Sequence, residues 1–137
     1  MKDLGTLGGT LSEAYGINDK GQIVGYSETS SGSLHAFLYE KGEMKDLGTL
    51  GGLDSYGRAI NNSGMIVGYS DTPSGESHAF LYDNAVMNDL GTLFGIKESR
   101  AFSINNSGQI VGWSDSFIAG WRHAVLWDPY KIISSLR

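Results

Sequence analysis

Three histidines in matching surroundings are the residues of this chain best suited to chemistry. His35, His78 and His123 each begin a segment that continues Ala-Phe-Leu-Tyr or Ala-Val-Leu-Trp. Neutral imidazole is a common metal ligand, and a symmetric fold would gather three equivalent rings around one axis. A buried imidazole also needs a hydrogen-bond partner, which the backbone or a nearby carboxylate can supply. The aspartates that recur in step with the histidines are Asp3, Asp46 and Asp89. We expect the structural role for the histidines, with no metal site and no cofactor.

A second repeated polar residue is the asparagine at Asn18, Asn61 and Asn105, each three residues before a glycine. Its side-chain amide has the donors and acceptor needed to bind a ligand. Asparagine and glycine also accept the positive φ of tight turns, and an asparagine side chain can hydrogen-bond the backbone two residues on. We therefore expect these asparagines to stabilise turns.

Aromatic side chains are the best candidates for binding a ligand, because their faces stack on the C–H faces of sugars. Two sets of equivalent aromatics recur in the chain. The first set is Tyr26, Tyr69 and Trp113, and the second is Tyr39, Tyr82 and Trp127. The competing interpretation is that both sets fill the space between sheets. The first set is the one we name as a tentative ligand site.

Trp121 and Arg122 have no counterparts in the earlier parts of the chain. They lie in a segment that is one residue longer than its equivalents and that also carries Phe117 and Ile118. An exposed, unrepeated tryptophan is typical of a binding surface, although it can also pack within its own loop. We include both residues among the tentative ligand-binding residues.

The sequence favours a non-enzymatic protein. Catalysis needs an asymmetric set of nucleophile, base and orienting group, whereas every histidine here is a repeated element. No GxSxG, HExxH or phosphate-binding loop is present, so we assign no catalytic residue. A hydrolase remains the least favoured alternative.

All these residues belong to three near-copies of one unit of about 43 residues. The units span residues 1–43, 44–86 and 87–131, followed by an expected C-terminal strand at 132–137, within a single domain of residues 1–137. Repeats of this period are typical of solenoids, propellers and pseudo-symmetric barrels. The repetition is therefore stronger evidence for a scaffold than any single residue is for an activity.

Short β-branched and aromatic segments between turn residues predict an all-β fold with four strands per unit. In the first unit one strand ends at Ile17, and the next three are Gln22 to Ser27, Ala36 to Tyr39 and Met44 to Leu47. Tight turns should join the first two strands of each unit. Within the third strand, alternation places His, Phe and Tyr on one face.

Composition excludes some partners. The net charge is −5 and basic residues are scattered, so nucleic acid is not an expected partner. No apolar run is long enough for a membrane helix, and we expect no contact with a membrane. The first residues already belong to the first unit, which leaves no signal peptide in this chain.

Three blocks resemble a known family: Asp-Leu-Gly-Thr-Leu-Gly-Gly, Ile-Asn-x-x-Gly-x-Ile-Val-Gly-Tyr-Ser and His-Ala-Phe-Leu-Tyr. They are similar to the bacterial extracellular repeats named the HAF family for the His-Ala-Phe triplet, from Met1 to about Trp127. The resemblance implies a scaffold in an exported protein, extracellular or periplasmic, and no particular activity. The third unit departs from the pattern at Phe94, Val125 and the ending 132–137, which questions the regularity of its last blade.

The resemblance and the four short strands per unit favour propeller-type blades over the alternative, a β-trefoil. Three blades are fewer than the four to eight that close a propeller, so we expect a homodimer that closes one ring of six blades. In this arrangement Met1 to Leu4 supply the missing fourth strand of the last blade, which removes an open sheet edge. The expected function is an interaction scaffold for protein or another ligand, and the alternative is a carbohydrate-binding lectin with quasi-equivalent sites.

Overall fold

The computed structural model describes residues 1–93, 97–118 and 120–129. Eleven strands in these residues form three separate antiparallel sheets, which confirms the all-β prediction. The first sheet has the order β1 (Gly8–Ile17), β2 (Ile23–Thr29), β3 (Leu34–Glu40), β4 (Glu43–Asp46). The middle sheet has the order β5 (Ser55–Ile60), β6 (Ile66–Asp71), β7 (Ser77–Asp83), β8 (Val86–Gly91). The third sheet has the order β11 (Arg122–Trp127), β10 (Ile110–Asp115), β9 (Ser99–Ile104).

Tight turns join the first two strands of every sheet, as the sequence predicts. Their glycines, Gly21, Gly64 and Gly108, have φ angles of 76°, 83° and 84°. Side chains other than Asn and Asp rarely adopt this region, which accounts for the glycine in each repeat.

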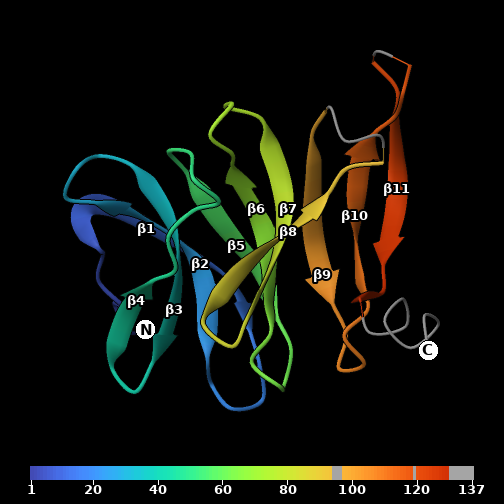
Figure 1. The fold of residues 1–137 in the computed structure, drawn as a ribbon. Coiled ribbons are helices and arrows are strands. Elements are labelled where there is room, and N and C mark those ends of the chain that lie inside the picture. Colours follow the sequence, from blue (N-terminus) through green and yellow to red (C-terminus); the bar gives the residue numbers. More distant parts are fainter. Residues whose placement is uncertain (94–96, 119, 130–137) are drawn as a thin grey trace.

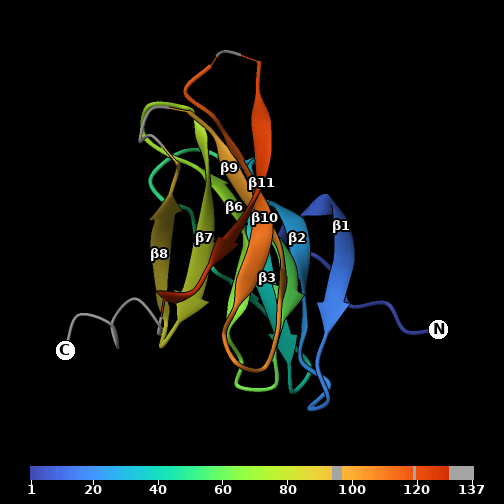
Figure 2. The same ribbon diagram turned by 90° about the vertical axis from the view of Figure 1, so that its right-hand side faces the viewer.

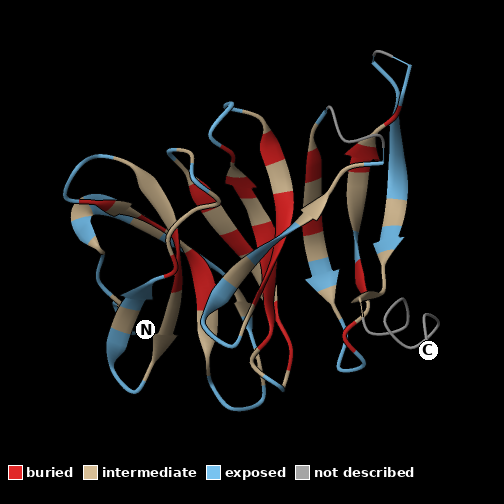
Figure 3. Ribbon diagram, in the orientation of Figure 1, coloured by how far each residue is buried: buried red, intermediate tan, exposed pale blue. Residues whose placement is uncertain are grey.

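The three sheets stand in a row, face against face, as Figure 1 shows. In the view turned by 90°, the sheets overlap one another along this row (Figure 2). One apolar core fills the junction between the first and middle sheets, and a second fills the junction between the middle and third sheets. The middle sheet is therefore buried on both faces (Figure 3).

Each junction joins two different kinds of sheet face. We call the face that carries Val24, Ala36 and Leu38 in the first sheet the valine face. The face that meets it across the junction is the isoleucine face of the middle sheet, with Ile60, Ile66, Phe80 and Tyr82. The second junction repeats this arrangement with the equivalent residues. Its valine face carries Val67, Ala79 and Leu81, and its isoleucine face carries Ile104, Ile110 and Trp127.

A glycine in the second strand of each sheet allows a close approach of the backbone. A Cβ atom on Gly25, Gly68 or Gly112 would lie 1.9 Å from a carbonyl oxygen of the neighbouring strand. Each sheet has an irregularity of the strand register close to this point. The glycine of the Ile-Val-Gly block is therefore fixed by sterics.

The trefoil alternative is wrong, whereas the pairing of Met1 to Leu4 with a second chain stays a prediction. Residues 1–6 form no strand, so Met1 to Leu4 do not complete the third sheet of their own chain. Instead the amide of Leu7 donates to Ser27 Oγ over 2.8 Å, which holds the start of the chain against the first sheet. The described strands also form three open sheets, whereas the trefoil alternative requires a closed barrel. The expected strand at 132–137 lies outside the described residues.

Candidate functional site

The tentative ligand-binding tyrosines lie in a continuous row of ring contacts that crosses all three sheets. Tyr26 meets Tyr56 with ring centroids 5.1 Å apart, and Tyr56 meets Tyr69 at 4.9 Å. The row begins at Tyr15, 5.8 Å from Tyr26, and continues from Tyr69 to Phe102 at 6.1 Å. Offset and edge-on contacts at these distances stabilise aromatic pairs beyond their burial. The sequence identified one member of the row in each unit and missed the others, whose positions are not aromatic in all three units.

Arginines extend the row to Trp113 of the third sheet. The Arg100 guanidinium lies 4.3 Å from the Tyr69 ring and 5.6 Å from the Trp113 ring. Arg122 lies 3.4 Å from the Trp113 ring, and its Nε is 3.3 Å from an Asp115 oxygen. A cation over an aromatic face is attracted by the quadrupole of the ring. We call the tyrosines, Phe102, Trp113 and these arginines, together with Arg58, the aromatic-arginine row.

Arg58 is the arginine of the middle sheet in this row, and it bridges the outer sheets. Its guanidinium lies 4.3 Å from the Tyr15 ring and 5.2 Å from the Phe102 ring. The three residues occupy equivalent places in β5, β1 and β9. A cation between two aromatic rings therefore links all three sheets.

Carboxylates near the row influence its tyrosines. Burial raises the pKa of Tyr26 well above its usual range, and the neighbouring Glu13 carboxylate acts in the same direction. Burial likewise raises the pKa of Tyr56, with a further contribution from Asp54. The hydroxyl of Tyr15 donates to Glu13 and lowers the pKa of that carboxyl. These phenols are neutral at physiological pH, and the row presents aromatic faces and guanidinium charges.

Trp121 is not part of the row, although Arg122 is. Its side chain is 56% exposed at the end of the loop between β10 and β11. Phe117 and Ile118 are also exposed in this loop, and the three side chains line a shallow apolar hollow. The backbone of the loop is closed by a hydrogen bond from the Trp121 amide to the Ile118 carbonyl, at 3.0 Å.

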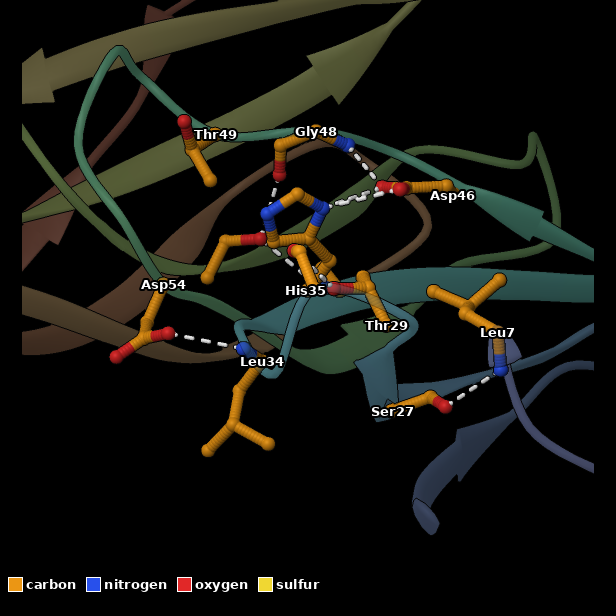
Figure 4. A network of polar contacts seen from close by, with 12 residues as sticks. Leu7, Ser27, Thr29, Leu34, His35, Asp46, Gly48, Thr49 and Asp54 are labelled. Carbon is orange, nitrogen blue, oxygen red and sulfur yellow. Dashed lines mark hydrogen bonds and ion pairs between the residues drawn. The ribbon is translucent and has the colours of Figure 1, made fainter. Parts of the chain in front are cut away.

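Two of the three repeated histidines form the expected contact with an aspartate. His35 Nδ1 lies 2.9 Å from an Asp46 oxygen, and His78 Nδ1 lies 2.9 Å from an Asp89 oxygen. Figure 4 shows the first pair, with the Gly48 amide also donating to Asp46. Each pair joins the third strand of a sheet to the fourth, which is a structural role. His123 is exposed, and no ion pair to a carboxylate is recorded for it within residues 97–118 and 120–129.

The repeated asparagines stabilise their turns and also link one sheet to the next. In each turn the side-chain oxygen accepts two backbone amides, as at Asn18, where the donors are Lys20 and Gln22. The side-chain amide of Asn18 donates to the carbonyl of Asn61 over 2.9 Å, and that of Asn61 to the carbonyl of Asn105 over 3.1 Å. The sequence predicted the first role and not the second.

Repeated serines form a further link between sheets that the sequence did not reveal. The amide of Ala36 donates to Ser55 Oγ over 2.8 Å, and the amide of Ala79 donates to Ser99 Oγ over 2.9 Å. These serines are fully buried. Their recurrence at one position of every unit is the sequence signal that could have identified them.

The second set of aromatics lies in or beside the cores rather than in a binding site. Tyr82 belongs to the first core, and Trp127 packs against the second while its indole N–H donates to the Leu90 carbonyl at 3.1 Å. Tyr39 is half-buried on the outer face of the first sheet, with the Lys2 ammonium 5.7 Å from its ring.

The described residues contain no group of three or more His, Cys, Asp or Glu side chains arranged to hold a metal ion. Among the same residues, no helix has the length and apolar character to cross a membrane. The chain matches no protein-family model, no curated protein and no solved structure.

Proposed function

We propose that the protein is a non-enzymatic interaction scaffold built from propeller-type blades. One observation carries the proposal: the two junctions between sheets use equivalent residues in the same contacts. A chain that repeats one junction is organised to extend a surface, as in other repeat proteins. The resemblance to HAF repeats supports an exported bacterial setting.

The repeated polar side chains support a scaffold over an enzyme. The imidazoles of His35 and His78 are engaged with aspartates, and Asn18 and Asn61 are engaged with the turns of the next sheet. The repeated histidines and asparagines of the first two units, which the sequence offered as metal-binding or ligand-binding groups, therefore have structural partners.

The surface proposed to bind a protein ligand is the apolar hollow around Trp121. A solvent-exposed tryptophan beside two exposed apolar side chains has the composition of an interface anchor.

The experiment is a binding measurement with three proteins: wild type, Trp121→Ala and a control, Val86→Ala. Val86 is equally exposed but lies on the β7–β8 hairpin. Exported proteins of the source organism serve as the probe, followed by each purified partner in isolation. We expect Trp121→Ala to weaken binding of a purified partner at least about tenfold, as for an interface anchor. Binding that is equal for all three proteins would overturn the assignment of this surface.

A lectin is the second candidate, favoured by the aromatic-arginine row. Tyr15 is 43% exposed at one end of the row, and Trp113 and Arg122 lie at the other. A glycan array tests this function directly. Binding that is lost in Trp113→Ala and kept in Trp121→Ala would replace the protein-binding scaffold by the lectin. Turnover of a panel of ester, glycoside and peptide substrates would overturn the non-enzymatic proposal altogether.

A further inference from the structure

The two ends of the row of sheets expose the two faces that the internal junctions bury. On the valine face of the third sheet, Val111 is 48% exposed and Leu126 is 59% exposed. Their equivalents in the middle sheet, Val67 and Leu81, are 0% and 6% exposed because the third sheet covers them. Within the described residues, the open valine face therefore corresponds to a junction that lacks its second sheet.

The opposite end of the molecule exposes an isoleucine face. Ile17, on β1 of the first sheet, is 67% exposed, whereas its equivalent Ile60 is 7% exposed in the first junction. Ile23 and Tyr39 on the same face are only half-buried. Each internal junction pairs a valine face with an isoleucine face, so the two open ends of the chain are complementary to each other rather than to themselves.

The histidine-aspartate series also leaves one partner unpaired with its counterpart at each end of the chain. His123 takes the place of His35 and His78, but the third aspartate of the series, Asp3, lies at the other end of the chain. Asp3 is already held in the conformation of its equivalents. Its carboxylate accepts the amide of Gly5 at 2.9 Å, as Asp46 accepts that of Gly48 at 2.8 Å. The φ angles of these glycines are 83° and 76°.

The serine and asparagine links divide in the same way. Ser55 and Ser99 each donate to a glycine carbonyl and accept the amide of an alanine from the preceding sheet. Ser12 donates to the Gly5 carbonyl in the same manner, and Ala124 on the open third sheet is the remaining alanine of the series. The side-chain amide of Asn105 and the backbone carbonyl of Asn18 are the corresponding donor and acceptor of the turns.

We propose that a second copy of this chain docks its first sheet on the open valine face of β9, β10 and β11. Residues 1–6 of the second copy then lie beside β11 as the fourth strand of the third sheet. The junction repeats the internal ones: His123 contacts Asp3, the backbone amide of Ala124 donates to Ser12 Oγ, and the side-chain amide of Asn105 donates to the Asn18 carbonyl. Val111 and Leu126 are covered by Ile17, Ile23 and Tyr39.

The contact is head to tail, because a valine face of one copy meets an isoleucine face of the other. Such a contact either closes into a ring or continues into a filament. The homodimer of six blades expected from the sequence is the smallest ring. The inference rests on the scaffold part of the proposed function and not on any ligand.

The test uses two full-length variants that each disable one end. Leu126→Glu places a charge on the open valine face, and Ile17→Glu places one on the open isoleucine face, where burial of an unpaired charge is costly. Both positions are exposed in the single chain, so each variant should keep its fold, which circular dichroism checks. Val86→Glu, on an exposed position of the β7–β8 hairpin, is the matched control.

Light scattering after size-exclusion chromatography at micromolar concentration measures the mass of the assembly. Wild type and the control should have at least twice the 14.7 kDa mass of one chain, and each end variant alone should have the mass of one chain. An equimolar mixture of the two end variants should return to twice that mass, because one junction with both faces intact remains.

A wild-type protein with the mass of one chain would overturn the inference. So would an end variant that stays assembled, since it implies a contact at another surface. A mixture that stays monomeric would also overturn it, since an intact valine face and an intact isoleucine face then fail to bind each other. These outcomes are independent of the ligand experiments, because mass is measured without any ligand.

Discussion

The middle sheet and the third sheet contain the same sequence blocks but differ in what covers them. Val67 and Val111 follow the same isoleucine, yet the first is fully buried and the second is about half exposed. His78 has an aspartate partner on the next strand, whereas His123 is exposed. Repeated residues therefore have a fixed place in the sheet, and their energetic role depends on the neighbouring sheet.

The largest expected effect concerns a glycine that should be equally important in the middle sheet and in the third sheet. Gly68→Ala places a Cβ atom 1.9 Å from the Tyr56 carbonyl oxygen, and Gly112→Ala places one 1.9 Å from that of Arg100. The backbone must move apart in both cases, and we expect each variant to lose about 3 kcal/mol or more of unfolding free energy. Urea denaturation measures the loss. A mild effect in the third sheet alone would show that its strands are less tightly held than those of the middle sheet.

The next effect should separate the two sheets. Leu81→Ala removes a buried side chain from the second core, and we expect it to cost about 3 kcal/mol of unfolding free energy. Leu126→Ala removes the equivalent, exposed side chain, and we expect less than about 0.5 kcal/mol in the separate chain. Denaturation at a concentration where the chain is monomeric gives both values. Equal losses would mean that Leu126 is buried in solution.

A smaller effect concerns the turn of the middle sheet. Gly64 has a φ of 83° and ample space around it, so only backbone strain opposes a side chain there. We expect Gly64→Val to lower the unfolding free energy by about 1 to 2 kcal/mol. Gly64→Asn should be much better tolerated, because asparagine accepts positive φ. The idea fails if thermal denaturation gives the same melting temperature for the valine variant and wild type.

The smallest effect concerns Tyr26, the residue of the first sheet that is equivalent to Trp113 of the third sheet in the aromatic-arginine row. Burial raises the pKa of Tyr26 in the folded chain above the ordinary value of 10.0. The unfolded chain therefore releases this proton first, and stability that is fully present below pH 10 is lost as the pH rises above it. Tyr26→Phe should show a shallower loss of unfolding free energy between pH 9 and pH 11. Identical slopes for the two proteins would rule out this contribution.

Much of the fold could be predicted from the sequence, because the residues that determine the turns and strands recur in every unit. Glycine three residues after Asn18, Asn61 and Asn105 predicted turns, since few other residues adopt positive φ. Alternation and β-branched residues predicted the strands to within two residues in the first sheet. The trefoil alternative stayed open because a strand pattern is the same in a barrel and in a stack of sheets.

The candidate site was harder to predict than the fold. The sequence selected Tyr26, Tyr69 and Trp113 by recurrence, and these side chains do lie in one row. It missed Arg58, Arg100 and Tyr56, because the residue type at their positions changes from unit to unit and recurrence did not mark them. Trp121 was selected for being unrepeated, and the structure separates it from the row to which Arg122 belongs.

The sequence by itself determined the local structure of this protein: the strands, the turns and the glycines at which a side chain does not fit. These features depend on φ angles and on sterics between adjacent strands, both of which are encoded within one unit. Only the tertiary structure decided which copy of a residue is buried, which histidine has its aspartate and which sheet faces stay open. Such properties belong to pairs of sheets, so three nearly identical units acquire different environments according to their place in the row.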